Sequence, residues 1–475
     1  MSKYMIPEKY YFRIHHCRPR FKGNVENVLI YMATEITRIG DCSKDEFNNS
    51  LNNAIKCFPG NSTLVLKTIN NWRTEISSLF GLFYEDENHV NHAMLRAKEL
   101  AEHNDLVEFF KLFLYYFQYP GAHIKSKDVL EQIEAGIHFK PAQYILKLLR
   151  TAEETTGKRC GITKEEACYC VFNDLRCTRD NEDVRETWNR IQKNRDLEIE
   201  YVAKGDVTRY AGDILDYMQH ANLLVSYNNK EFFINHNENE AILKYINSNE
   251  WFSGYDSMIT KRKGTINAVN ACKSDWFIYV NREAANTDFS TDITTFFAEE
   301  ENESSKASSR MKFFAAYMDK LKSLDKLKTK DIGDIGESLV HGHECQRLKI
   351  SGREDLVHLV TKIPTELAVG YDISSREVDD TIRNIEVKTT ISSKPIVFNK
   401  IHLTPNEWQA AKSYKDRYFV YRLMVSKSEI KLYILQDPVN LFKQDLIDIT
   451  PRDGMEITFR EAAGRYEELL SWEEN

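Results

Sequence analysis

The chain of 475 residues is too long for a single hydrophobic core, so two to four domains are expected. An apolar content of 42% and a charged content of 29% fit an ordinary globular protein. The net charge of −8 weighs weakly against a nucleic-acid partner, although an acidic chain can still hold a local basic surface.

The N-terminus, the apolar segments and the cysteines indicate the cellular compartment in which the protein is expected. Residues 1–4 begin no apolar run before a small-residue cleavage site, so no secretory signal is expected. The most apolar segment, 106–119, is too short and too charged to span a bilayer, which predicts a buried helix and no membrane contact. Nine cysteines lack paired zinc-ligand spacing, which favours reduced thiols in the cytoplasm.

Residues 1–158 are predicted to form a mostly helical region. Apolar residues recur with helical spacing at 62–83, 88–119 and 128–156, and the Pro-Gly pair at 120–121 separates the last two segments. A candidate winged helix lies within this region at 25–100.

Residues 159–297 are predicted to form a second winged-helix domain followed by a connector. Helices are expected at about 182–194 and 213–224. Two short apolar strands follow at 224–227 and 231–234, separated by a turn that contains two Asn residues. Helix, helix and hairpin is the order of a winged helix-turn-helix.

The polar segment 298–310 is the predicted linker, because it contains few apolar residues. A lysine-rich helix is expected directly after it. Residues 311–475 then alternate between strand and helix patterns, which predicts a separate α/β domain.

This last domain contains a predicted hairpin with a concentration of charged side chains. Ile385 and Val387 alternate with Glu386 and Lys388, so the two charged residues share one face of a strand while the apolar pair packs in the core. Residues 367–374 are the expected partner strand, with Asp372 near its end. The polar segment 375–382 is the expected turn.

The hairpin would bring two carboxylates and an ammonium group together. Mg2+ prefers oxygen ligands, which Asp372 and Glu386 offer, and Lys388 would hold the attacking water or offset negative charge on a phosphodiester. A salt-bridged hairpin on the protein surface is the alternative. Glu429 and Lys431 have the same spacing without an upstream Asp strand, so they are interpreted as a solvated strand face.

Residues 404–407 (Thr-Pro-Asn-Glu) predict the start of a helix. Thr404 is the expected N-cap, Pro405 stands at the first helical position, and Glu407 is placed to complete a capping box. Capping is therefore the favoured role of Glu407, with a direct part in chemistry as the alternative.

Several separated blocks resemble one known family. They are Gly336-Glu337, Glu344, Gly370–Ile373, Ile385–Thr390 and Leu403–Trp408, followed by Tyr418 and Tyr421-Arg422. Together, over about residues 330–438, they resemble the C-terminal domain of the plant protein NO VEIN and its bacterial relatives, in the restriction-endonuclease-like PD-(D/E)XK superfamily. Tyr371 stands where the superfamily name has Pro.

The resemblance implies a metal-dependent nuclease with a central mixed sheet flanked by helices, bound to Mg2+ or, as a substitute, Mn2+. Asp372 and Glu386 would be the metal ligands, Lys388 the superfamily lysine and Glu337 an accessory acid. The N-terminal region resembles, more diffusely, the recognition domains of type IIS restriction enzymes.

Target choice would then belong to the N-terminal regions. Asn and Arg side chains can pair with bases, and Lys side chains suit phosphates. The candidate DNA-binding residues are Asn70, Asn71, Arg73, Arg209, Gln219, Asn222, Lys230, Lys261, Arg262 and Lys263. For each of them a solvated helix face is the alternative.

The sequence therefore predicts an α+β multidomain protein that acts as a sequence-specific restriction endonuclease on double-stranded DNA. Cutting both strands of a palindrome would need a homodimer on DNA, and a protective methyltransferase would be a separate protein. Two alternatives are a modification-dependent or antiphage nuclease with partner subunits, and a non-catalytic DNA-binding scaffold.

Overall fold

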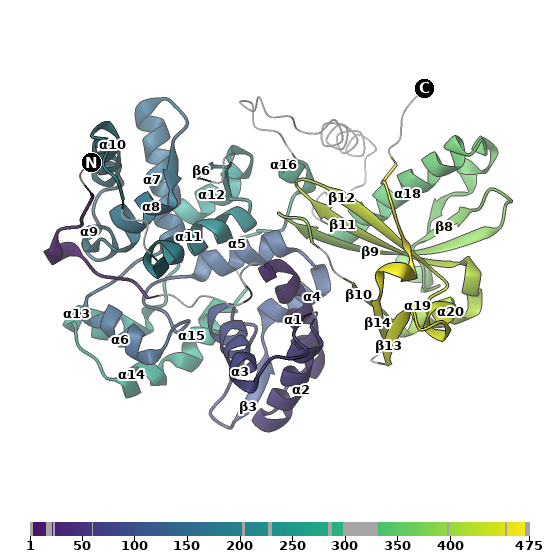
Figure 1. Cartoon of the computed structure of the whole chain (residues 1–475), viewed down its shortest axis with the longest axis horizontal. Helices are drawn as coiled ribbons and strands as arrows, with labels where there is room; N and C mark the ends of the chain where they lie inside the picture. The colour runs from purple at the N-terminus through teal and green to yellow at the C-terminus, as the bar shows by residue number, and fades with distance from the viewer. Residues whose placement is uncertain are drawn as a thin grey trace. The chain divides into compact units, whose positions relative to one another are not determined.

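The computed structural model (Figure 1) describes most of the chain. The described residues are 3–15, 21, 24–58, 60–201, 205–226, 230–283, 287–297, 331–396, 399–451 and 454–470. They form two compact units. Unit 1 comprises Met1–Glu102 and Leu106–Ser290, and unit 2 comprises His103–Asp105 and Thr291–Asn475.

Unit 1 begins with three helices and a small antiparallel sheet of order β1-β3-β2. These elements are α1 (Val25–Ile39), β1 (Cys42–Ser43), α2 (Lys44–Cys57), α3 (Leu66–Thr74), β2 (Phe83–Glu85) and β3 (Val90–Ala93). The helix predicted at 62–83 is confirmed in α3 and the π-helical turn Glu75–Leu79 that continues it. The prediction at 88–93 is wrong, because this segment pairs with β2 and β1 as strand β3.

Four helices follow, two on each side of the Pro-Gly break. They are α4 (Leu95–His103), α5 (Leu106–Tyr116), α6 (Ser126–Glu134) and α7 (Pro141–Thr156). The apolar segment at 106–119 forms the buried helix α5, as predicted. None of the helices within the described ranges has the length and apolar character needed to traverse a bilayer.

The next part of unit 1 combines helices with a second three-stranded sheet, of order β4-β6-β5. Its elements are β4 (Gly161–Thr163), α8 (Lys164–Ala167), α9 (Leu175–Thr178), α10 (Val184–Asp196), α11 (Gly205–His220), β5 (Leu224–Val225) and β6 (Glu231–Ile234). The predicted pairing of the last two strands is confirmed, while residues 227–229 of its turn lie outside the described residues. The helices α12 (Asn239–Ile246), α13 (Asp256–Lys261), α14 (Ile266–Ala271) and α15 (Lys273–Val280) complete unit 1.

Unit 2 is built on a six-stranded mixed sheet of order β15-β12-β11-β9-β8-β7. Its strands are β7 (Thr361–Lys362), β8 (Ile373–Arg376), β9 (Ile382–Ser392), β11 (Tyr418–Ser426), β12 (Ile430–Gln436) and β15 (Arg465–Glu467). A smaller sheet contains β10 (Lys400–Leu403), β14 (Met455–Phe459) and β13 (Ile447–Pro451). The helices are α16 (Ile293–Phe297), α18 (Ile332–Ile350), α19 (Pro405–Tyr414) and α20 (Pro438–Lys443).

Strands β9 and β11 are the parallel pair of this sheet. A parallel pair needs a crossover connection, and the segment that holds α19 supplies it. Every residue of β11 is buried, as expected for a central strand covered on both faces.

The helices cover opposite faces of the sheet. Thr389 of β9 lies against Gly336 of α18, whereas the neighbouring Lys388 contacts Glu407 of α19. Because successive side chains of a strand alternate between faces, α18 and α19 lie on different sides of β9 (Figure 1).

Two predicted segments fall outside the described residues. They are the linker at 298–310 and the lysine-rich helix that follows it. The mixture of helical and α/β parts is confirmed, while the finer domain bounds and the winged-helix assignments stay predictions.

Candidate active site

The hairpin of β8 and β9 brings Asp372 beside Glu386, as the sequence predicts. The backbone N–H of Asp372 donates to the carbonyl of Ile385 at 2.9 Å, so Asp372 enters the sheet beside that residue. Its carboxylate accepts a hydrogen bond from the backbone N–H of Val387 at 2.8 Å. Both contacts fix the carboxylate against the strand that carries Glu386 and Lys388.

The predicted bounds of the partner strand are wrong. Strand β8 begins after Asp372 and runs through Arg376, instead of occupying 367–374. Ala368 and Gly370 have φ values of 47° and 82°, which an extended strand does not accommodate. The turn between the strands is correspondingly shorter than 375–382.

Lys388 is held between two carboxylates. Its Nζ lies 2.6 Å from Glu386 Oε1 and 2.8 Å from Glu407 Oε2. The Lys388 side chain is 25% exposed, while those of Glu386 and Glu407 are 5% and 14% exposed, so Lys388 is the most exposed member of this group.

The charges of this site are unbalanced. Burial raises the pKa of Asp372, and neither the hydrogen bond from Val387 nor the Lys388 ammonium reverses the shift. Burial raises the pKa of Glu386 further still, against the attraction of Lys388. Burial alone would also raise the pKa of Glu407, but the Lys388 ammonium and its hydrogen bond lower it overall. Three carboxylates thus surround one ammonium group.

This donor set fits a divalent cation. Asp372 and Glu386 offer carboxylate oxygens, which Mg2+ and Mn2+ accept as ligands. Their raised pKa values reflect burial first and the neighbouring carboxylates second, against the lowering effect of Lys388. A divalent cation would supply the missing positive charge.

Glu337 lies on α18, where the charge of Asp372 acts on it. Its carboxylate pairs with Lys362 of β7 at 3.0 Å, and Lys362 stands opposite Ile373 in the sheet. Burial raises the pKa of Glu337 despite this pairing, and the negative charge of Asp372 contributes to the shift. The preceding Gly336 lets α18 approach β9 closely.

A buried network anchors α18 to the sheet, and its centre is Glu344, one of the residues that carry the resemblance. Glu344 is fully buried and accepts hydrogen bonds from Arg347, Ser375, Arg383 and Tyr421. Burial would raise the pKa of Glu344, but Arg383 and Arg347 lower it to about 2. A carboxylate paired in this way stays ionised and fixes the helix that carries Glu337.

Two residues of β11 also support the site. Arg422 is buried and donates to the carbonyl of Lys388 at 3.1 Å and to Thr390 Oγ1 at 2.6 Å. The Tyr418 hydroxyl donates to the carbonyl of Gly370 at 3.0 Å. Both residues belong to the sequence blocks that carry the family resemblance. Their contacts join segments far apart in the sequence, so no local pattern predicts them.

The second Glu-x-Lys pair differs from the first in its surroundings. Lys431 Nζ lies 2.8 Å from Glu429 Oε1, and both side chains are 37% exposed. The interpretation of this pair as a solvated strand face is confirmed.

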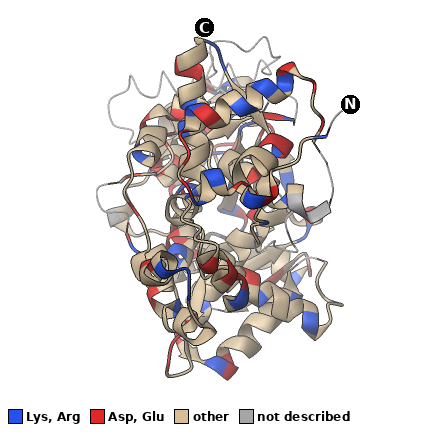
Figure 2. Cartoon of the chain, turned by 90° about the vertical axis from the view of Figure 1, so that its left-hand side faces the viewer, with Lys and Arg blue, Asp and Glu red and all other residues tan. Residues whose placement is uncertain are grey.

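The candidate DNA-binding residues lie in unit 1. Asn70, Arg209, Lys230, Lys261, Arg262 and Lys263 are exposed, and Asn71, Arg73 and Gln219 are half-buried. Asn222 is different, because it is 1% exposed and donates to Glu238 at 2.7 Å. Its prediction as a base reader is therefore wrong. In the view of Figure 2, basic and acidic segments alternate along the helices instead of separating into two regions.

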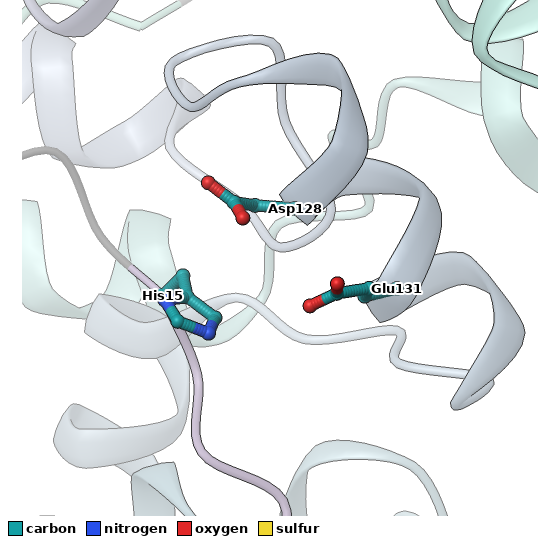
Figure 3. A group of neighbouring side chains, drawn as sticks. All are labelled: His15, Asp128 and Glu131. Atoms are coloured by element: carbon teal, nitrogen blue, oxygen red, sulfur yellow. The ribbon is translucent and has the colours of Figure 1, made fainter.

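One further group of potential metal ligands lies in unit 1, outside the candidate site. His15 precedes α1, whereas Asp128 and Glu131 lie on α6, and their ligand atoms lie within 4.8 Å of one another (Figure 3). All three side chains are half-buried. Such groups are common without an ion, and this one is not assigned a function.

The comparisons with known proteins divide the chain in the same way. Residues 4–277 match the family described as restriction endonuclease BpuJI, N-terminal. The chain belongs to this BpuJI N-terminal family. The family match confirms the resemblance of the N-terminal region to restriction-enzyme recognition domains.

A solved structure supports the assignment of the BpuJI-type region. It is a crystal structure of pyrene- and phenanthrene-modified DNA in complex with the BpuJ1 endonuclease binding domain. The two proteins are 26% identical, with a TM-score of 0.50, over 57% of this chain and 98% of the other. Among curated proteins, none matches the chain.

Residues 336–435 match the family described as protein NO VEIN, C-terminal, which confirms the second resemblance. The matched range includes Glu337, Asp372, Glu386, Lys388 and Glu407. The BpuJI-type region and the candidate active site therefore belong to different parts of one chain.

Proposed function

We propose that this protein is a sequence-specific restriction endonuclease of the PD-(D/E)XK type, which hydrolyses DNA phosphodiester bonds with Mg2+. One observation carries the proposal: Asp372, Glu386 and Lys388 meet on one hairpin of a chain whose N-terminal region belongs to a restriction-endonuclease family. An exposed salt-bridged hairpin, the alternative, does not fit the burial of Glu386.

Asp372 and Glu386 would hold the cation. When bound, Mg2+ would lower the pKa of a coordinated water and stabilise charge on the phosphate. Lys388, whose ammonium lies 2.6 Å from Glu386, would offset the negative charge that develops on the scissile phosphate. Glu337, held by Lys362, would act as an accessory acid.

Unit 1 would bind the duplex. The likeness to the BpuJ1 binding domain, whose crystal structure contains DNA, supports this part of the proposal. Lys230, Lys261, Arg262 and Lys263 are exposed and suited to phosphate contacts. The two winged-helix assignments in unit 1 remain part of the proposal.

Cleavage of both strands at a palindromic site would require two active sites, so we expect two chains to meet on DNA. A separate methyltransferase would protect host DNA in the cytoplasm.

The test is to incubate the protein with plasmid and phage DNA in Mg2+, in Mn2+ and in EDTA. Discrete fragments that form with either cation and not in EDTA would support the proposal. Cutting of methylated DNA alone would support the modification-dependent alternative. Binding without cutting under all conditions would contradict the nuclease and favour the scaffold. Asp372→Ala should bind DNA normally and cut none.

A further inference from the structure

Glu407 has two distinct sets of partners. It completes the capping box of α19, because its backbone N–H donates to Thr404 Oγ1 at 3.4 Å and its carboxylate accepts from the backbone N–H of Thr404 at 3.0 Å. The same carboxylate oxygen, Oε2, also accepts from Lys388 Nζ at 2.8 Å. The capping box confirms the role predicted from sequence, and the second contact adds to it.

The contact with Lys388 is more than a surface ion pair. The Glu407 side chain is 14% exposed, and the Thr404 backbone fixes one of its oxygens in place. Exposed pairs contribute little, because both side chains remain mobile and solvated. Here the carboxylate is held by its own helix start, so the position of α19 determines where the ammonium lies.

The two anions of Lys388 have different surroundings. Glu386 lies beside Asp372 and is a proposed cation ligand, so its oxygens would bind the cation as well as Lys388. Glu407 is bound to the N-terminal turn of α19, and the partial positive charge of that turn favours its ionised form. Of the two, Glu407 is therefore the anion that can hold Lys388 while Glu386 serves as a ligand.

We propose that Glu407 is a positioning residue that holds the Lys388 ammonium beside Glu386 and links it to the start of α19. This inference rests on the proposed nuclease function. It assigns to Glu407 a task that capping alone does not require, because a capping box accepts Gln in place of Glu.

The experiment compares Glu407→Gln with Thr404→Ala in the full chain. Gln keeps the cap but removes the negative charge that holds Lys388. Thr404→Ala removes the capping hydroxyl, while the backbone N–H that binds Glu407 remains. The two variants therefore separate the positioning role from the capping role.

Five quantities are measured for each variant: the cleavage rate, the DNA dissociation constant, the Mn2+ affinity, the unfolding temperature and the acylation of Lys388. Acylation by an amine-reactive ester is quantified by mass spectrometry relative to Lys412, which lies on α19. We expect Glu407→Gln to slow cleavage roughly 10- to 100-fold, the range found when a supporting residue is lost. Lys388 acylation should rise several-fold, with DNA affinity unchanged, and it is the acylation, not the unfolding temperature, that separates the two variants. Thr404→Ala should lower the unfolding temperature by a few degrees and leave Lys388 acylation unchanged.

Two results would overturn the inference. Lys388 acylation that is equal in Glu407→Gln and the wild-type protein would leave Glu407 as a cap only. A loss of Mn2+ affinity in Glu407→Gln as large as that in Asp372→Ala would make Glu407 a cation ligand instead. If the wild-type protein cut no DNA, the proposed function would fail, whereas the acylation comparison would still decide whether Glu407 holds Lys388.

Discussion

Replacing Gly336 with Ala should loosen the helix α18 from the sheet. A Cβ at this position would overlap Thr389 Oγ1 and would lie 2.8 Å from Thr389 Cβ and 3.1 Å from its Cγ2. Rotating the Thr389 side chain moves its hydroxyl but not its Cβ, which β9 fixes between β8 and β11. The helix must therefore shift away from the strand.

The size of the effect follows from two opposing contributions. Overpacking of a close contact costs about 1–3 kcal/mol. The cost here should be in the upper half of this range, because β9 is a central strand that cannot move aside. Ala is favoured over Gly in a helix by about 1 kcal/mol. We expect a net loss of about 1–2 kcal/mol, which corresponds to a roughly 5- to 30-fold change in the population of the open state.

Gly333→Ala is the matched control on the same helix. Its Cβ would meet only Asp331 Oδ1, at an ordinary 3.4 Å, so this variant should be neutral or more stable. Native-state hydrogen exchange suits a chain of two units, because it reports the opening of α18 and β9 separately from unit 1.

Amides of these two elements should exchange faster in Gly336→Ala and should be slowed in part when Thr389→Ala is added. Equal exchange in Gly336→Ala and Gly333→Ala would refute the packing argument.

Two other predictions concern the proposed cation site. Gly370→Ala should reduce cleavage strongly, because Asp372 lies two residues away and the loop has no room for a Cβ. The added Cβ would lie 2.5 Å from the Asn406 carbonyl oxygen and 2.9 Å from Ala410 Cβ, at a φ of 82° that disfavours Ala. Unchanged Mn2+ affinity and cleavage would contradict this prediction. Because the pKa values of Asp372 and Glu386 are raised, protons compete with a cation for these carboxylates at a higher pH than they would for ordinary ones. Affinity for Mn2+ should therefore fall as the pH is lowered, by up to about tenfold per pH unit for one competing proton. Calorimetry at a series of pH values from neutral downward tests this, and an affinity independent of pH would count against these two ligands.

The sequence was sufficient to locate Asp372, Glu386 and Lys388 because the strand period puts Glu386 and Lys388 on one face. It did not locate the start of β8, since the left-handed conformation at Gly370 goes with a close approach to Asn406 of α19, which is a long-range contact. A capping box is a local signal within four residues, so the helix start at Thr404 was predictable.

Contacts between residues far apart in the sequence could not be predicted in this way. The capping motif contains nothing that indicates the contact of Glu407 with Lys388, because the tertiary fold brings the two residues together. Asn222 was predicted to be an exposed base reader because it is polar and follows an amphipathic helix. It is instead buried, where it hydrogen-bonds to Glu238 and Asn235, and these long-range contacts cannot be predicted from the local sequence. Residues 88–93 were assigned to a helix as the start of the helical pattern at 88–119, whereas their strand structure depends on pairing with β1 and β2.

The most direct test of the central claim compares Lys388→Ala with Lys431→Ala. Both variants remove the lysine of a Glu-x-Lys pair in unit 2, but Lys388 belongs to the candidate site and Lys431 to an exposed strand face. Cleavage and binding of one DNA are measured side by side in Mg2+. We predict that Lys388→Ala binds DNA without cutting it and that Lys431→Ala does both. Cleavage that survives in Lys388→Ala at the rate of Lys431→Ala would contradict the assignment of the active site.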